Sequence, residues 1–182
     1  MPFRPKKKPE PLAEPALYEY AVNALGRRMR TVAELTRLMR NRVEPGETGQ
    51  AKINSVIERL KDHGYLNDAD YAANYTRLRQ ENASFGKRRV RQDLTIKGVH
   101  AELIATTLDA AYENVNEEAL ARRHLERKGV KQPTNDKEAA RVMRMLIRAG
   151  FSTGVIYGIL KRWNISEEAL AALEAAEDGP AD

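Results

Sequence analysis

The sequence contains no cysteine, which excludes disulfides and cysteine-based zinc sites. It has only three histidines, His63, His100 and His124, whose wide spacing does not suit a metal site, so we expect each to face solvent. No stretch approaches the roughly 18 apolar residues of a membrane-spanning helix, and no apolar run follows the basic N-terminus as in a secretory signal. We therefore expect a protein of the cytoplasm without a metal, cofactor or membrane segment.

Patterns typical of catalysis are also missing. Gly86-Lys87 lacks the upstream glycine of a phosphate-binding loop and the Ser or Thr that follows its lysine. The adjacent acids Glu117-Glu118 and Glu167-Glu168 stand near expected helix starts, where they stabilise the helix dipole. We therefore predict a binding protein rather than an enzyme, with no catalytic residues.

The sequence is rich in charge, and its distribution is uneven. All 31 Lys and Arg lie in residues 1–164 together with 20 of the 26 acids, so this part has a net charge of +11. Residues 165–182 hold the other six acids and no base. A basic body of this size attracts polyanions, either nucleic acid or an acidic groove of a protein. The acidic end is expected to aid solubility, and weak competition for the basic surface is the alternative.

Apolar residues recur three and four positions apart in nine successive segments, which is the pattern of amphipathic helices. No segment shows the alternation of a strand, so the sequence predicts an all-α protein. Thr31 and Glu34 form a capping-box pattern before the second segment. The fourth segment is predicted to turn Tyr71, Tyr75 and Leu78 inward, with base stacking as the alternative for the two tyrosines.

The helices repeat in groups of three. A shift of 52 residues brings the middle of the chain onto its last third and matches Arg89 with Arg141, Val90 with Val142, Leu94 with Leu146 and Gly98 with Gly150. A shift of 55 residues relates Leu35 and Met39 more weakly to Val90 and Leu94. Three-helix units of this size cannot bury their apolar faces alone, so neighbouring units are expected to stack into an elongated body.

Residues 85–99 combine a helical pattern with strong positive charge. Val90 and Leu94 share one helix face, Gly98 can end the helix, and Arg88 points about 140° away from the apolar pair. We predict that binding is carried by the cations of this middle part: Arg77, Arg79, Lys87, Arg88, Arg89, Arg91 and Lys97. A second group is weaker: Arg27, Arg28, Arg30, Arg122, Arg123, Arg141 and Arg144. The alternative for any one of them is a solvated charge worth under about 1 kcal/mol.

Residues 17–163 resemble the RecX family of bacterial recombinase regulators. The most specific part of the resemblance is Gly64-Tyr65-Leu66-Asn67-Asp68, followed by Tyr71-Ala72, Tyr75, Arg77, Gly86, Arg88-Arg89-Val90 and Lys97-Gly98-Val99. Arg148-Ala149-Gly150-Phe151-Ser152 with Val155-Ile156 resembles the family's third repeat.

The resemblance implies three tandem three-helix repeats that form a curved rod. We therefore expect five parts: a disordered, basic, Pro-rich N-terminus at 1–15, repeats at 16–64, 65–113 and 114–164, and an acidic tail at 165–182.

The resemblance also implies a function in homologous recombination, DNA repair and the SOS response to DNA damage. Members bind the RecA filament on single-stranded DNA and modulate, mostly inhibit, its ATPase, strand-exchange and co-protease activities. Two alternatives stay open: a helical protein that binds DNA without sequence preference and without RecA, and a helical scaffold whose charge only keeps it soluble. We expect the protein to be a monomer.

Overall fold

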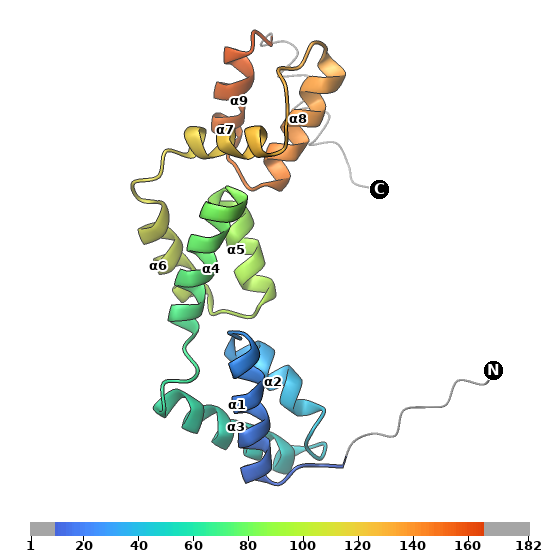
Figure 1. Ribbon diagram of the computed structural model, residues 1–182, viewed down its shortest axis with the longest axis vertical. Coiled ribbons are helices and arrows are strands. Elements are labelled where there is room, and N and C mark those ends of the chain that lie inside the picture. Colours follow the sequence, from blue (N-terminus) through green and yellow to red (C-terminus); the bar gives the residue numbers. More distant parts are fainter. Residues whose placement is uncertain (1–9, 166–182) are drawn as a thin grey trace, which may run out of the picture. The chain divides into compact units, whose positions relative to one another are not determined.

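The computed structural model describes residues 10–165, and within them it contains nine α-helices and no strand (Figure 1). This confirms the predicted all-α fold. The helices are α1 (Glu14–Arg27), α2 (Val32–Arg40), α3 (Glu47–Asp62), α4 (Asp68–Ala83), α5 (Lys87–Ile96), α6 (Ala101–Tyr112), α7 (Glu117–Arg127), α8 (Asp136–Arg148) and α9 (Thr153–Arg162).

The predicted disordered N-terminus and acidic tail fall mostly outside the described residues. Of the segment 1–15, residues 10–15 are described, and α1 already begins at Glu14. The Leu12 backbone N–H also donates a hydrogen bond of 2.7 Å to the Arg42 carbonyl. The folded part therefore starts a few residues before the predicted first repeat. Of the tail, only Ile165 is described.

The chain divides into two compact units. The first consists of residues 1–72 and 94–103, and the second of residues 73–93 and 104–182. Helices α4, α5 and α6 each contribute residues to both units. This division into two units does not test the predicted repeat boundaries at 64/65 and 113/114, which remain a prediction.

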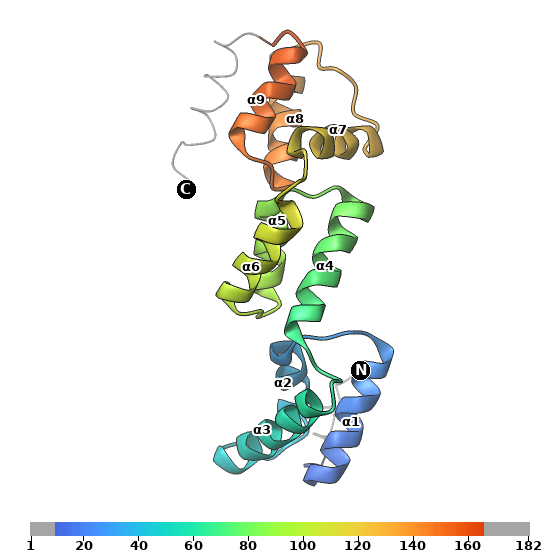
Figure 2. The ribbon, with the colours of Figure 1, turned by 90° about the vertical axis from the view of Figure 1, so that its left-hand side faces the viewer.

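In the first unit, α1, α2 and α3 pack against one another, and they lie side by side in both ribbon views (Figures 1 and 2). Each helix buries an apolar stripe spaced three and four residues apart, as the sequence pattern predicts. Full burial of one such side chain contributes about 1.5–3 kcal/mol. The fully buried side chains of this core are Leu17, Ala21, Leu35, Met39, Val56 and Leu60.

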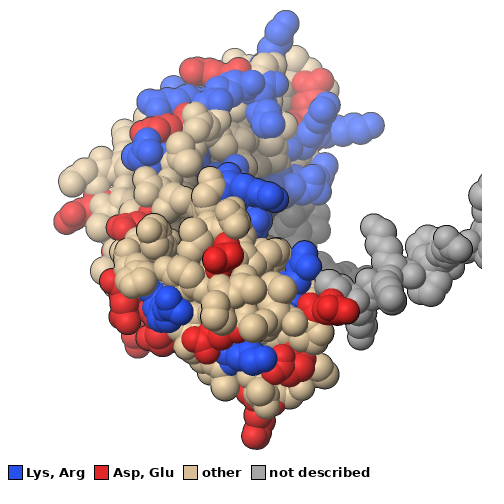
Figure 3. Space-filling view, turned by 60° about the horizontal axis from the view of Figure 1, so that its bottom comes forward, with Lys and Arg blue, Asp and Glu red and all other residues tan. Residues whose placement is uncertain are grey.

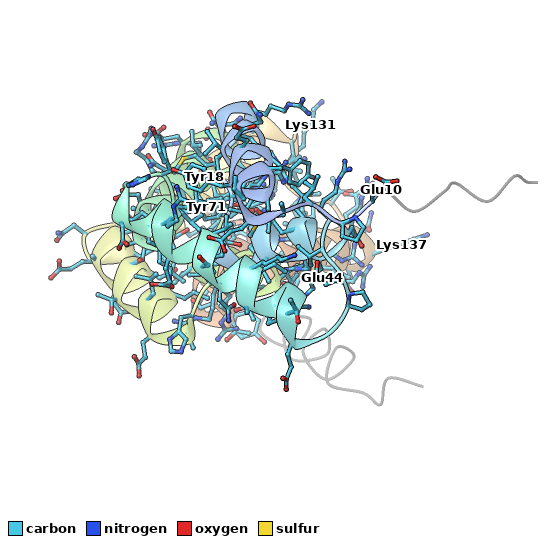
Figure 4. The ribbon with its side chains drawn as sticks, turned by 90° about the horizontal axis from the view of Figure 1, so that it is seen from below. Glu10, Tyr18, Glu44, Tyr71, Lys131 and Lys137 are labelled. Carbon is cyan, nitrogen blue, oxygen red and sulfur yellow. The ribbon has the colours of Figure 1, made fainter. Side chains whose placement is uncertain are left out.

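Polar contacts join the helices of the first unit at its surface. The Tyr18 hydroxyl, labelled in Figure 4, lies 2.7 Å from His63 Nδ1, and the Arg59 guanidinium lies 4.3 Å from the centre of the Tyr18 ring. His63 and His100 are exposed, as predicted. Tyr18 therefore links α1 to the end of α3 while its apolar body covers the core.

The end of α5 is attached to the start of α2 within the first unit. The Thr31 hydroxyl accepts a bond from the Glu34 N–H (3.0 Å), and Glu34 in turn accepts one from the Thr31 N–H, which confirms the capping box. The same hydroxyl donates to the Lys97 carbonyl at 2.7 Å. Gly98 has a positive φ of 78° and lies against Ala33 with no room for a side chain. We call Thr31, Ala33, Glu34, Lys97 and Gly98 the first joint.

The end of α8 is attached to the start of α5 in the same way within the second unit. The Gly86 N–H donates to the Ala149 carbonyl (2.8 Å), and the Arg88 N–H donates to the Gly150 carbonyl (3.2 Å). Gly150 has a positive φ of 87° and packs on the Arg89 backbone. We call Gly86, Arg88, Arg89, Ala149 and Gly150 the second joint.

The two joints are equivalent under the shifts found in the sequence. A shift of 52 residues carries Lys97-Gly98 onto Ala149-Gly150, and a shift of 55 residues carries Thr31 onto Gly86. In both joints a carbonyl at a helix end accepts a hydrogen bond from the start of another helix, beside a glycine in the left-handed conformation. The helices therefore form tandem three-helix repeats.

His124 is the clearest correction to the predicted exposures. It was expected to face solvent, but only 4% of its surface is exposed. Its Nδ1 lies 2.9 Å from the Ala83 carbonyl, and its ring lies 5.9 Å from that of Phe85 and 6.2 Å from that of Phe151. A carbonyl at the end of α4 therefore forms a hydrogen bond with one ring nitrogen, and this bond offsets the cost of burying the imidazole between two aromatic rings.

Helix α4 turns fewer large side chains inward than predicted. Tyr71 is buried and Tyr75 is half-buried, with its hydroxyl donating to Asp93 at 3.0 Å, but Leu78 is 45% exposed. The buried stripe instead continues to Thr76, which is fully buried. Leu78 follows Thr76 by two residues, about 200° around the helix, and therefore points away from that stripe.

Candidate binding surface

Several of the cations predicted for the middle of the chain form ion pairs. Their partners are neighbouring acids on the same or another helix: Arg77 with Glu81 (2.9 Å), Lys87 with Asp109 (2.7 Å), Arg89 with Asp93 (3.0 Å) and Lys97 with Glu34 (3.3 Å). Arg88 and Arg91 are exposed. Since exposed ion pairs contribute little, these cations can still exchange their partners for an external anion.

Lys87 and Arg79 illustrate two different environments. Lys87 donates to Asp109, and this hydrogen bond and charge hold the pKa of the carboxyl below its ordinary value. The Arg79 guanidinium lies 4.7 Å from the centre of the Tyr75 ring and is half-buried. Burial raises the pKa of that tyrosine. Arg79 therefore packs on a tyrosine of its own helix, whereas Lys87 pairs with an acid of α6.

Lys97 belongs to the first joint, in the first unit, while the other six predicted cations lie in the second unit. Its Nζ lies 5.7 Å from the centre of the Tyr71 ring, in addition to the pair with Glu34. Burial lowers the pKa of Lys97, but Tyr71 and Glu34 outweigh it, so the pKa is raised. Lys97 is thus a partly buried structural cation.

The second group of predicted cations is spread over both units. In the first unit, Arg27 and Arg28 are exposed at the end of α1, and the Arg30 Nε donates to the Ala24 carbonyl at 3.3 Å. In the second unit, Arg122 pairs with Glu118 at 2.9 Å. The remaining members are exposed: Arg123, Arg141 and Arg144.

The second unit brings several of these cations around one pocket of about 440 Å³ at the second joint, which we call the joint pocket. It contains Arg89 from the first predicted group and two members of the second group. Its lining residues are Phe85, Arg89, His124, Lys128, Arg141, Arg144, Met145, Arg148 and Ala149. Figure 3 shows Lys and Arg gathered in the upper part of the face in view, whereas the lower part mixes both signs.

Two pocket cations, Lys128 and Arg148, were missed by the sequence reasoning. Arg148 stands two residues before Gly150, which the 52-residue shift had matched with Gly98, so its position at the joint was a usable signal. Lys128 follows the last residue of α7. No periodic pattern predicts that the end of α7 meets α8 at this point.

The described residues contain neither a cluster of metal ligands nor a candidate membrane span. Among residues 10–165 no group of three or more His, Cys, Asp or Glu could hold a metal ion. None of the helices that the structure describes is long and apolar enough to cross a membrane.

Comparisons with known proteins agree on one family. The family model described as RecX, second three-helix domain, matches residues 67–108. The Regulatory protein RecX of Leptothrix cholodnii is 35% identical over 142 residues, which cover 78% of this chain and 85% of that protein. The Regulatory protein RecX of Mycobacterium ulcerans is 32% identical over 156 residues, which cover 84% of this chain and 87% of the relative.

Two crystal structures share the fold. One is of a regulatory protein RecX, with a TM-score of 0.66 and 22% identity, and the match covers 82% of this chain and 71% of the other. The second is of RecX from Lactobacillus salivarius, with a TM-score of 0.64 and 20% identity over 83% of this chain and 96% of the other. Together with the sequence relatives, they show that the chain belongs to the RecX family.

Proposed function

We propose that this protein regulates the RecA recombinase by binding the RecA filament on single-stranded DNA, and that it mostly inhibits ATP hydrolysis, strand exchange and co-protease activity. The observation that carries the proposal is the membership of the RecX family, whose members matched here are named regulatory proteins. The protein acts by binding, without a catalytic residue or cofactor of its own, as a monomer in the cytoplasm.

The fold suits a partner that is itself a polymer. Tandem repeats offer several separate surfaces to a filament made of identical subunits, and weak contacts on one chain then add as linked binding events. The exposed cations, among them Arg88 and Arg91, speed the encounter with a filament that carries DNA and acidic protein surface.

Two kinds of inhibition follow from such a complex. The bound protein excludes a second DNA strand from the filament, or it stabilises an arrangement of subunits that hydrolyses ATP slowly or dissociates. The first leaves ATP hydrolysis unchanged while strand exchange stops. The second lowers both together.

The test uses RecA–ATP filaments formed beforehand on single-stranded DNA at near-physiological salt. The protein is added and ATP hydrolysis and strand exchange are followed, with its binding to the same DNA without RecA measured as a control. Inhibition far below the concentration that saturates bare DNA supports the proposal. Inhibition only at saturation of bare DNA would indicate competition for the DNA instead, and no effect at saturating protein would contradict the proposal.

A pair of double variants tests the contribution of the basic helix. We expect Arg88→Ala with Arg91→Ala to weaken inhibition about tenfold, since each exposed cation contributes under about 1 kcal/mol. The matched control, Arg40→Ala with Lys137→Ala, removes the same charge from exposed residues outside the predicted groups. If both double variants lose inhibition equally, only net charge matters and α5 is not the contact surface.

A further inference from the structure

The two equivalent joints differ in charge. At the first joint, Glu34 lies 3.3 Å from Lys97, so the acid and the base balance each other. The 55-residue shift carries Glu34 onto Arg89, and the 52-residue shift carries Lys97 onto Ala149. The second joint thus has the base Arg89 where the first has the acid Glu34. It has the apolar Ala149 where the first has the base Lys97. The second joint therefore lacks the acid–base pair that links the two helices at the first joint, and Arg89 pairs instead with Asp93 of its own helix.

The joint pocket beside the second joint gathers further positive charge. Three arginines of α8, Arg141, Arg144 and Arg148, stand at positions i, i+3 and i+7 and so lie along one side of that helix. Arg89 of α5 and Lys128 after α7 bring the number of cations that line the pocket to five. None of the residues lining this pocket is acidic.

Two acids that neighbour the pocket cations already have partners. Asp93 pairs with Arg89 from within α5 at 3.0 Å. Glu138 lines a neighbouring pocket, where it accepts a bond of 2.8 Å from the Thr134 N–H. That bond, with weaker help from Arg141, holds the pKa of Glu138 below its ordinary value. Because five cations and no acid line the pocket, it favours an anion.

The backbone beneath the pocket is fixed. Gly86 and Arg88 donate hydrogen bonds to the end of α8. A Cβ on Gly86 would lie 2.8 Å from the Phe151 nitrogen, so the two segments are in direct contact. The His124 ring is held on the Ala83 carbonyl at 2.9 Å. The backbone that positions the cations therefore does not have to become ordered when an anion binds, which lowers the entropic cost of binding.

The pocket also contains an aromatic surface. Phe85 is half-buried, and the Arg89 guanidinium lies 5.7 Å from the centre of its ring. Guanidinium groups match the oxygens of a phosphate with two parallel hydrogen bonds. An aromatic ring beside them offers a stacking surface to a nucleotide base. A volume of about 440 Å³ lies in the range of pockets that hold small-molecule ligands.

We propose that the joint pocket binds a backbone phosphate of single-stranded DNA, with the adjacent nucleotide against Phe85. This goes beyond the proposed function, because the site binds DNA in the absence of RecA. It also assigns a role to Lys128 and Arg148, which hold the phosphate together with Arg141 and Arg144. The charge-balanced first joint has no such role.

The test measures binding of the full-length protein to a fluorescent oligothymidine at several salt concentrations without RecA. We expect Arg141→Gln with Arg148→Gln to weaken binding about tenfold and to reduce the slope of log K against log salt by about 0.7, the value for one phosphate of a single strand. The control Arg40→Gln with Lys137→Gln removes the same charge outside the pocket and should change affinity less than twofold. Equal losses in the two double variants would overturn the proposal.

Two further binding measurements identify the class of ligand. Phe85→Leu should weaken binding of oligothymidine but not of an abasic chain with the same number of phosphates, provided that its circular dichroism and melting temperature match the wild type. Polyglutamate of the same charge should compete poorly. If polyglutamate competes as well as DNA, and if its affinity falls in the variant Arg141→Gln with Arg148→Gln, the pocket binds acidic protein and the proposal is wrong. Because RecA is absent, this failure leaves the proposed function intact.

Discussion

Gly150 packs directly on Arg89, so closely that a Cβ atom on Gly150 would lie 2.8 Å from the Arg89 Cα. Its φ of 87° lies in the left-handed region, which side chains other than glycine's rarely adopt. This contact brings the end of α8 to the start of α5 and thereby places Arg148 and Arg89 at the same pocket.

Replacing Gly150 by alanine should therefore destabilise the second unit. The variant combines backbone strain with overpacking, and we expect it to lower the free energy of unfolding by about 2–4 kcal/mol. Urea denaturation followed by circular dichroism measures the change. Gly154→Ala is the control, since a Cβ there meets no atom within 4 Å and its φ is ordinary. It should be neutral or stabilise by up to about 1 kcal/mol, and a comparable loss in both variants would refute the close contact.

Thr31 stabilises the first joint through one hydroxyl with two partners. In Thr31→Ala, α2 loses its cap and the Lys97 carbonyl loses a donor at 2.7 Å. We expect a loss of about 2–3 kcal/mol from these two effects together. Thr31→Ser keeps the hydroxyl and should lose markedly less in the same denaturation experiment. A serine variant as unstable as the alanine variant would show that the methyl group, not the hydrogen bonds, stabilises the joint.

Asp68 makes the stability depend on pH. Its Oδ1 accepts a bond of 2.9 Å from the Val32 N–H, and burial raises the pKa of this carboxyl above 3.8 despite that bond and nearby Lys61. The folded protein therefore binds the proton more tightly than the unfolded chain, so this group's contribution falls as pH rises from 3.8 through the raised pKa.

The Asp68→Asn variant keeps the acceptor oxygen but has no charge to bury. Its stability relative to the wild type should increase as the pH rises from about 3 to 7, and then stay constant. Denaturation curves of both proteins at a series of pH values measure this difference. A difference that decreases with rising pH would mean that the charged form of Asp68 is the stabilised one.

Two apolar residues of α5 differ in burial, so replacing each by alanine should affect stability differently. Leu94 is fully buried, whereas Ile96 is 67% exposed. We expect Leu94→Ala to cost about 2–5 kcal/mol through the cavity it leaves, and Ile96→Ala to change stability by less than about 0.5 kcal/mol. Thermal melting of both variants tests the orientation of the helix. Similar losses would mean that α5 is rotated from the position described.

The helices themselves could be predicted because their determinants are local. The spacing of Val90 and Leu94 and the capping box at Thr31 and Glu34 depend on neighbours within one or two turns, and the structure confirms both. The shared glycine at the ends of α5 and α8 also followed from the sequence, since a left-handed residue is a local requirement.

The orientation of individual side chains was less predictable. Leu78 fits an apolar pattern yet is exposed, because the partners of α4 cover the stripe through Ala72 and Thr76 instead. His124 fits a polar surface yet is buried, because the end of α4 supplies a carbonyl to its ring. In both cases the deciding group lies on another part of the chain.

The sequence by itself determined the all-α class, the three-helix repeat and the excess of positive charge, because these depend on periodicity and composition. Only the tertiary structure decided which cations stand together. Arg89, Lys128 and Arg148 are separated by 20 residues or more, and they line one pocket because Gly86 and Gly150 let two helix ends approach without side chains between them. Such an encounter depends on the distance between backbones far apart in the sequence, which no local pattern encodes.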